Sequence, residues 1–227
     1  MTEALPRITI IGATGDLGSG IAYKLARAGY SVIIGSRSAE KAGKAAAALA
    51  ERTGRPIEGM ENGAAAAAGD IIILTVPFAS HRSMLEAVRD GAQGKIFVDA
   101  TVPLVPPRVA RVQLPADGPV AKQAQEFLGE SVRVVSAFQN IAAAHLHDDK
   151  QHDADCDVLV CGNDPKAREL VVQLAEAMGM RAWHAGAIDN SAVAEALTSV
   201  LIFLNKRYKI DGAGIRITGV PGSAGGA

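Results

Sequence analysis

Apolar runs and helical stretches alternate along the first half of this sequence. Short, mostly β-branched apolar runs are typical of strands buried on both faces of a sheet. The expected strands are residues 8–11, 31–34, 71–76 and 96–98. After the first strand, Ile21, Ala22, Leu25 and Ala26 recur at helical spacing ahead of Gly29, a residue type that commonly ends a helix. Further helices are expected at residues 38–52, 64–68 and 80–88. This alternation predicts a parallel sheet with crossover helices.

The second half opens with an irregular segment and then returns to the same alternation. Prolines recur from Pro103 to Pro119 with few periodic apolar positions, which predicts a surface crossing without regular structure. Asp164 and Pro165 are placed to cap and begin a helix that Gly179 ends. Strands are expected at residues 132–135, 157–160 and 181–184. A last helix, residues 191–204, carries apolar residues on more than one face, which predicts packing in a homodimer interface.

Composition and charge narrow the class of partner. The 227 residues carry a net charge of −1 with 21% charged residues, so no basic field attracts nucleic acid or an anionic membrane. No apolar stretch approaches the ~20 residues that a membrane helix needs, and residues 1–7 lack the features of a signal peptide. Cys156 and Cys161 are expected to be reduced, buried thiols. We therefore expect a cytoplasmic protein whose partner is a small molecule.

A glycine-rich motif connects the first strand to the first helix. It reads Gly12, Ala13, Thr14, Gly15, Asp16, Leu17 and Gly18. In this context Gly12 permits a tight turn, Gly15 lets the backbone approach a pyrophosphate, and Gly18 allows the helix to pack closely on the sheet. The helix N-terminus faces the negative charge, and Thr14 can add a hydroxyl hydrogen bond. The motif predicts a dinucleotide site in a Rossmann-type fold.

The end of the second strand indicates which dinucleotide binds. Chains that bind NAD usually carry Asp or Glu here, which holds the free ribose 2′-hydroxyl. This chain has Ser36 and Arg37 instead, and an arginine fork beside a serine hydroxyl suits a 2′-phosphate. Lys41 is a second candidate cation four residues after Arg37, and a solvated lysine explains it nearly as well. The sequence thus predicts NADP(H) rather than NAD(H).

Several motifs together resemble the family of NADPH-dependent reductases of coenzyme F420, a deazaflavin. The likeness spans residues 7 to about 218. Besides the glycine motif and Gly-Ser-Arg at 35–37, it rests on Leu-Thr-Val-Pro at 74–77, Val-Ser-Ala at 135–137, Val-Cys-Gly-Asn-Asp at 160–164 and Glu-Ala-Leu-Thr at 195–198. We expect an α/β fold, a Rossmann-type doubly wound parallel sheet formed by an NADP-binding domain at residues 1–135. Residues 136–218 are expected to form a smaller C-terminal α/β lobe for acceptor binding and dimerisation, and 219–227 a flexible tail.

The resemblance implies direct hydride transfer between nicotinamide C4 and deazaflavin C5, with the two rings stacked in a cleft between the domain and the lobe. The cofactors supply the reactivity and the protein supplies orientation, so no catalytic side chain is expected. The residues that match the family's nicotinamide side are Thr75, Val76 and Pro77. Those that match its acceptor side are Gln139, Asn140, Ile141 and Ala142, with Asn190, Ser191 and Thr198 on the C-terminal helix. Archaeal members read His-Thr-Ile-Pro at the position of 139–142, and some carry a basic residue at that of Ala192.

Three functions stay open at this point. One is hydride transfer between NADP(H) and coenzyme F420. Another is reduction of a flavin, a ferric complex or another small acceptor on the same scaffold, which the altered segment 139–142 keeps open. The third is an NADP(H)-sensing module without catalysis. A short-chain dehydrogenase is disfavoured, because Tyr23, Tyr30 and Tyr208 each lack the lysine four residues later that moves its proton.

A histidine- and aspartate-rich segment is the remaining candidate for chemistry. It contains His145, His147, Asp148, Asp149, His152 and Asp153. Their spacing matches no metal-ligand motif, so a solvated loop is expected and no metal site is predicted. His81 and His184 are expected to be structural histidines, and Trp183 to lie in the core.

Overall fold

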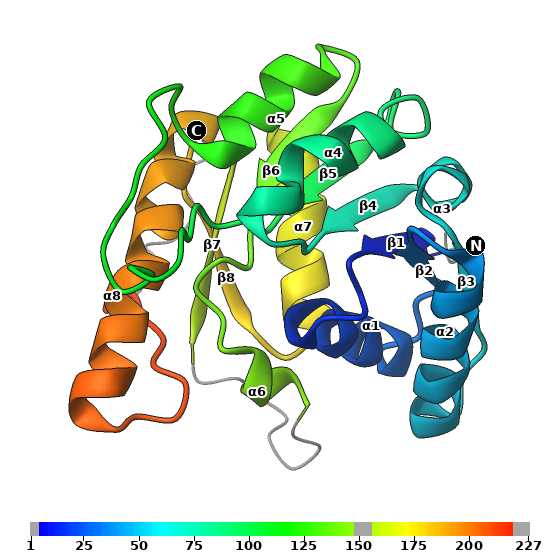
Figure 1. Cartoon of the computed structure of the whole chain (residues 1–227), viewed down its shortest axis with the longest axis horizontal. Coiled ribbons are helices and arrows are strands. Elements are labelled where there is room, and N and C mark those ends of the chain that lie inside the picture. Colours follow the sequence, from blue (N-terminus) through cyan, green and yellow to red (C-terminus); the bar gives the residue numbers. More distant parts are fainter. Residues whose placement is uncertain (1–4, 148–155, 220–227) are drawn as a thin grey trace.

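The elements form a single mixed sheet with helices on both faces (Figure 1). The computed structural model describes residues 5–147 and 156–219. Its strands are β1 (Ile8–Ile11), β2 (Val32–Ser36), β3 (Ile57–Glu61), β4 (Ile71–Leu74), β5 (Ile96–Asp99), β6 (Arg133–Ser136), β7 (Asp157–Gly162) and β8 (Arg181–His184). Its helices are α1 (Asp16–Arg27), α2 (Ala39–Thr53), α3 (Asn62–Ala68), α4 (Phe78–Val88), α5 (Val120–Leu128), α6 (Ala143–Leu146), α7 (Pro165–Ala177) and α8 (Ser191–Tyr208), with a 3₁₀ turn η1 (Ile188–Asn190) before α8.

The strand order is β3-β2-β1-β4-β5-β6-β7-β8. Strands β1 to β6 are parallel to one another, β7 runs antiparallel to β6, and β8 is parallel to β7. The order changes direction between β1 and β4, and open α/β sheets bind ligands beyond the carboxyl ends of the strands at such a point. The predicted Rossmann-type α/β fold is confirmed.

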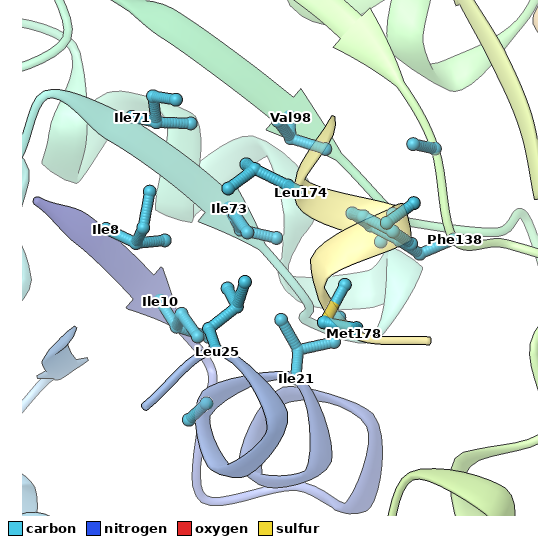
Figure 2. Close-up of a cluster of buried hydrophobic side chains, with 14 of the residues drawn as sticks. Ile8, Ile10, Ile21, Leu25, Ile71, Ile73, Val98, Phe138, Leu174 and Met178 are labelled. Atoms are coloured by element: carbon cyan, nitrogen blue, oxygen red, sulfur yellow. The ribbon is translucent and has the colours of Figure 1, made fainter. Parts of the chain in front are cut away.

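Side chains alternate along the central strands between two cores. The first core joins Ile10 and Ile73 of the sheet to α1, α2 and α7, and the second joins Ile72 and Phe97 to α3, α4 and α5. Figure 2 shows the first core, where side chains of α1 and α7 meet those of the strands. Because both faces are covered, each central strand reads as a continuous apolar run.

Most expected elements are present with shifted ends. The strand expected at 71–76 ends at Leu74, and the amide and hydroxyl of the next residue, Thr75, both donate to Ile11 O, at 2.9 and 3.0 Å. Helix α4 then begins at Phe78 rather than at residue 80, and α8 continues to Tyr208 rather than ending at 204. The segment from 103 to 119 contains no helix or strand, as predicted.

One strand and two α-helices were not predicted from the sequence: β3, α5 and α6. Strand β3 lies at the edge of the sheet and carries Glu58, Gly59 and Glu61, and charged residues are common on edge strands because they discourage pairing with another chain. Helix α6 spans only four residues. Strand β3 and helix α6 both lack the apolar periodicity from which strands and helices are predicted in a sequence.

The division of the chain at residue 135 stays a prediction. That position lies within β6, which pairs with β5 on one side and β7 on the other. Cys156 and Cys161 are buried and form no disulfide in the described part of the chain, and burial raises the pKa of the Cys161 thiol to about 11. Among the described residues, no helix is long and apolar enough to cross a bilayer. The tail predicted at 219–227 falls outside the described residues apart from Gly219.

The contact between β3 and α2 gives a test of the fold. A Cβ at Gly59 would come 2.5 Å from Ala42 C and 2.6 Å from Gly43 N, whereas one at the exposed Gly43 would meet no atom within 4 Å. We expect Gly59→Ala to lower the free energy of unfolding by about 1–3 kcal/mol through overpacking. Gly43→Ala should raise it by about 1 kcal/mol, because alanine is the better helix former. Urea denaturation measures both, and a neutral Gly59→Ala would contradict the close packing of β3 on α2.

Candidate functional site

The glycine turn between β1 and α1 is pressed against the end of β4. Gly12 has φ +93°, and a Cβ there would lie 2.9 Å from both Thr75 O and Val76 Cγ1. A Cβ at Gly18 would overlap Thr75 Oγ1 and come 2.8 Å from Ala13 Cα. Gly15 differs, because it is exposed and its Cβ would meet nothing closer than Gly12 O at 3.5 Å. Thus Gly12 and Gly18 serve packing, and Gly15 leaves the backbone accessible from outside.

A cavity of about 560 Å³ lies over this turn, within the usual size range of small-molecule sites. Of the residues expected to bind the dinucleotide, those that line it are Gly12, Thr14, Gly15, Ser36, Arg37, Lys41, Thr75, Val76 and Pro77. Asp16, Leu17 and Gly18 are not part of the lining. Helix α1 begins at the cavity with Gly15 as its N-cap and without a side-chain cap, so its first amides can meet an anion.

One end of the cavity carries positive charge without a partner. Arg37 and Lys41 are exposed there, next to Ser36 at the end of β2. The nearby carboxylate of Glu40 is paired with Lys44 at 2.6 Å. Within residues 5–147 and 156–219, neither Arg37 nor Lys41 forms an ion pair. This end therefore suits a phosphate group, which takes charge-assisted hydrogen bonds from such side chains.

The expected acceptor segment, residues 139–142, lies outside the lining of this cavity and is tied to the neighbouring strand end. Gln139 Nε2 donates to Asp99 O and to Ser136 Oγ, both at 2.8 Å. Asp99 pairs with Leu74 across β5 and β4, and Leu74 is the residue directly before Thr75. The segment is thereby held beside the β4 end of the cavity.

The amides of this segment are partly engaged within the protein. Gln139, Asn140 and Ile141 are buried, and Ala142 is half-buried. Asn140 Nδ2 donates to Asp157 O at 2.7 Å, so the side-chain amino groups of Gln139 and Asn140 both have partners. Gln139 Oε1 and Asn140 Oδ1 are buried and have no hydrogen-bond partner among the described residues. Each amide therefore has an acceptor atom left to satisfy, which is uncommon for buried polar groups.

The backbone enters this segment in a strained conformation. Phe138 is buried with φ +74°, and a bulky residue adopts the left-handed region only where its surroundings impose it. From α8, Thr198 Oγ1 donates to Gln139 O at 2.8 Å. The other two residues expected on that side bond elsewhere: Asn190 Nδ2 donates to Ala185 O, and Ser191 Oγ donates to Glu195 Oε1. Among the described residues, Thr198 is the one of the three whose side chain hydrogen-bonds to the acceptor segment.

The histidine-rich segment forms structural contacts where it is described. His145 Nε2 lies 3.0 Å from Gly212 O, and His147 Nε2 lies 2.9 Å from Asp16 O. No group of ligands able to hold a metal occurs in the part of the chain that the structure describes. Asp148, Asp149, His152 and Asp153 lie outside the described residues.

Known proteins are similar in sequence to this chain over nearly its whole length. The family model described as NADP oxidoreductase coenzyme F420-dependent matches residues 7–103. The F420-dependent NADP reductase of Methanocaldococcus jannaschii is 43% identical over 93% of this chain and 98% of its own length. That of Methanothermobacter thermautotrophicus is 41% identical over 95% of this chain and 96% of its own. The chain belongs to the F420-dependent NADP reductase family.

A solved structure has the same fold as this chain. The chain resembles a candidate F420-dependent NADP reductase from Arthrobacter sp. FB24 with a TM-score of 0.77 and 24% identity, covering 94% of this chain and 100% of that one. At that identity the likeness supports the fold alone. The relatives above cover the glycine turn and the acceptor segment together, and the resemblance inferred from the motifs is confirmed.

Sequence reasoning did not single out the buried acids of this family member, whereas His81 is structural as expected. His81 Nε2 and Asp99 Oδ2 lie 2.6 Å apart with almost no exposure, and Asp99 Oδ1 accepts from Thr101 N at 2.9 Å. This pair joins the first turn of α4 to the end of β5. Asp99 thus contacts α4 through its carboxylate and the acceptor segment through its backbone carbonyl. A polar residue directly after an apolar run was the available signal, since such residues gather at the carboxyl edge of a parallel sheet.

Glu195 is the second buried acid near this edge. Its carboxylate, 1% exposed, accepts from Val120 N at 2.8 Å, Ala121 N at 3.2 Å and Ser191 Oγ at 3.1 Å. It thereby joins α8 to the first turn of α5. Burial raises the pKa of Glu195 to about 7, against the effect of the hydrogen bonds, and the charge of Asp99 adds to the rise.

This raised pKa predicts a dependence of stability on pH. The folded protein holds the proton of Glu195 up to about pH 7, whereas the unfolded chain releases it near the ordinary value of 4.5. The contribution of Glu195 is therefore fully present below pH 4.5 and is lost as the pH rises through 7. Relative to Glu195→Gln, the wild-type free energy of unfolding should fall by about 3 kcal/mol across this range. Denaturant titrations at several pH values test it, and parallel curves for the two proteins would contradict it.

Proposed function

We propose that this chain is an oxidoreductase that transfers a hydride between NADP(H) and the deazaflavin coenzyme F420. The observation that carries the proposal is the cavity at the β1–β4 switch point, with unpaired cations at one end and the Thr75–Pro77 edge at the other. Its relatives, more than 40% identical over most of the chain, are named for that reaction. A cytoplasmic location stays a prediction from the composition.

The residues of the cavity fit NADP(H) group by group. The amides at the start of α1 and the exposed face of Gly15 receive the pyrophosphate. Ser36 and Arg37 take the 2′-phosphate, with Lys41 as a second cation. Thr75, Val76 and Pro77 then form the wall beside the nicotinamide, because they line the cavity at the end of β4. When bound, NADPH supplies the hydride.

The acceptor ring is proposed to lie between residues 75–77 and the segment 139–142. Asp99 supports this placement, because it borders Thr75 through β4 and binds Gln139 through its carbonyl. The unsatisfied oxygens of Gln139 and Asn140 can accept from the ring N–H of a pyrimidine-dione. In this arrangement the protein contributes position rather than an acid or base, which by itself accelerates a reaction between two bound groups.

The reaction itself is tested by following NADPH oxidation with F420, with a free flavin and with a ferric chelate as acceptors. We expect fast NADPH oxidation with F420 and not with the flavin or the ferric chelate. Turnover with flavin or ferric chelate but not with F420 would assign the chain to another acceptor on the same scaffold. Tight NADPH binding with no turnover on any of the three would indicate a sensing module.

Arg37 provides the test of NADP(H) binding. Arg37→Ala should weaken NADPH binding by about 10- to 100-fold, because a charge-assisted hydrogen bond to the 2′-phosphate is lost. NADH lacks that phosphate, so its affinity should not change. Calorimetric titration of both dinucleotides measures the difference. Arg55→Ala, an exposed arginine outside the cavity, serves as the control and should bind NADPH as the parent does.

Gln139 provides the test of the acceptor wall. Gln139→Leu keeps the size of the side chain but removes its bonds to Asp99 and Ser136 and its unpaired oxygen. We expect turnover with F420 to fall at least about tenfold while the NADPH dissociation constant stays the same, because a misplaced acceptor raises only the barrier of the transfer step. Gln93→Leu, on the far surface, is the matched control. Equal losses of NADPH affinity and turnover would assign the segment to the dinucleotide site instead.

We further propose that the protein is a homodimer joined through α8. Figure 1 shows this helix, in orange, at the opposite side of the molecule from α2 and β3. Its exposed apolar side chains are Val193 (63%), Val200 (44%), Phe203 (54%) and Tyr208 (65%). So many large apolar groups on one helix are typical of an interface.

The dimer is tested by light scattering. The chain of 23.4 kDa should give twice its mass at micromolar concentration, and a Val200→Asp, Phe203→Asp variant should give the monomer mass, because buried charges without partners oppose association. NADPH affinity should be retained in that variant. A monomeric parent protein would refute the dimer and leave the cofactor proposal as it stands.

A further inference from the structure

Asn62 has the one polar side chain in the described lining of the dinucleotide cavity that is both buried and incompletely bonded. It opens α3, directly after the edge strand β3, and is 2% exposed. Its Oδ1 has no hydrogen-bond partner among the described residues, and its Nδ2 donates only to Met84 Sδ, at 3.4 Å. Leaving a buried amide oxygen unpaired costs free energy, so a ligand that donates to it gains what the free protein lacks.

The register of the sheet places Asn62 next to the proposed phosphate site. Ser36 pairs with Glu61 across β2 and β3, so Asn62 follows the partner of Ser36 by one residue. In NADP(H) the base is attached to C1′ of the ribose and the phosphate to the neighbouring C2′. A phosphate held by Ser36 and Arg37 therefore brings the base to the side of the cavity where Asn62 lies. Gly35, Ser38, Ser80 and Met84 also line the cavity.

Met84 determines which end of the amide is left for a ligand. A thioether sulfur accepts hydrogen bonds and donates none, so the amino group of Asn62 turns to Met84 and the oxygen is the free end. Met84 is half-buried, and the flexibility of methionine lets it move to admit a flat ring. Gly35 contributes by having no side chain, since a Cβ there would come 3.1 Å from Asn62 Oδ1.

We propose that Asn62 makes this site selective for adenine by accepting a hydrogen bond from its 6-amino group. The proposal rests on the proposed binding of NADP(H) and adds a residue that reads the base. Hypoxanthine carries an oxygen in place of that amino group. This 6-oxygen and Asn62 Oδ1 are both acceptors, so they cannot form a hydrogen bond with each other. Asparagine recognises adenine through the same amino group in nucleic acids.

The experiment compares NADPH with its hypoxanthine analogue, reduced nicotinamide hypoxanthine dinucleotide phosphate, in one calorimetric or fluorescence titration series. The parent protein should bind NADPH about tenfold more tightly than the analogue. Asn62→Leu should bind the two within about twofold of each other, because neither base then meets an acceptor. Asn62→Asp retains an acceptor oxygen and should retain the preference for NADPH, although its negative charge weakens the binding of both dinucleotides. Gln173→Ala, which removes an exposed amide on α7, should keep the parent ratio.

The ratio of two dissociation constants on one preparation is independent of the fraction of folded protein, so a destabilised variant still gives an answer. Equal affinities in the parent, or an unchanged tenfold preference in Asn62→Leu, would overturn the proposal while leaving NADPH binding intact. Loss of the preference in Asn62→Asp as well would also overturn it, since the acceptor would then not be the cause. If the parent binds neither dinucleotide, the proposed function fails and the base selectivity fails with it.

Discussion

The close contact between the glycine turn and the end of β4 is the constraint on which the rest of the site depends. Thr75 donates twice to Ile11 O, and the positions of Gly12 and Gly18 leave no room for a Cβ against it. A bulkier residue at either position would separate β1 from β4 at their carboxyl ends. That separation would displace α1, whose first amides and Gly15 form one wall of the cavity, from residues 75–77, which form the other.

A second set of contacts extends this edge toward the C-terminal helix. Asp99 stands beside the end of β4, binds His81 through its carboxylate and holds Gln139 through its carbonyl. Thr198 joins Gln139 to α8, and Glu195, one turn earlier on α8, caps the start of α5. Because Asp99, Gln139 and Glu195 are buried, their hydrogen bonds are costly to break. The acceptor segment is therefore positioned by the same residues that attach α8 to the sheet.

Local patterns predicted the central sheet and the dinucleotide turn well. The apolar runs of β1, β2, β4 and β5 and the order of strand, glycine motif and helix depend on neighbours in sequence, and the structure has them where expected, apart from shifted ends. The edge strand β3 and the short α6 escaped because neither has a clear apolar period. Asn62 and Asp99 escaped for another reason: each acquires its role from a partner, as Asp99 does from Gln139, 40 positions away.

The sequence alone determined the fold class, the family and the preference for a phosphorylated dinucleotide, because residue type and short spacing carry that information. Arg37 in place of an acid is readable without coordinates. Only the tertiary structure decided which end of each amide is free. Gln139 and Asn140 were expected on the acceptor side from their positions alone, and in the described residues their amino groups are bound within the protein while their oxygens are not. Whether a buried polar atom is satisfied depends on groups that folding brings together from distant parts of the chain, and one sequence read locally contains no record of those contacts.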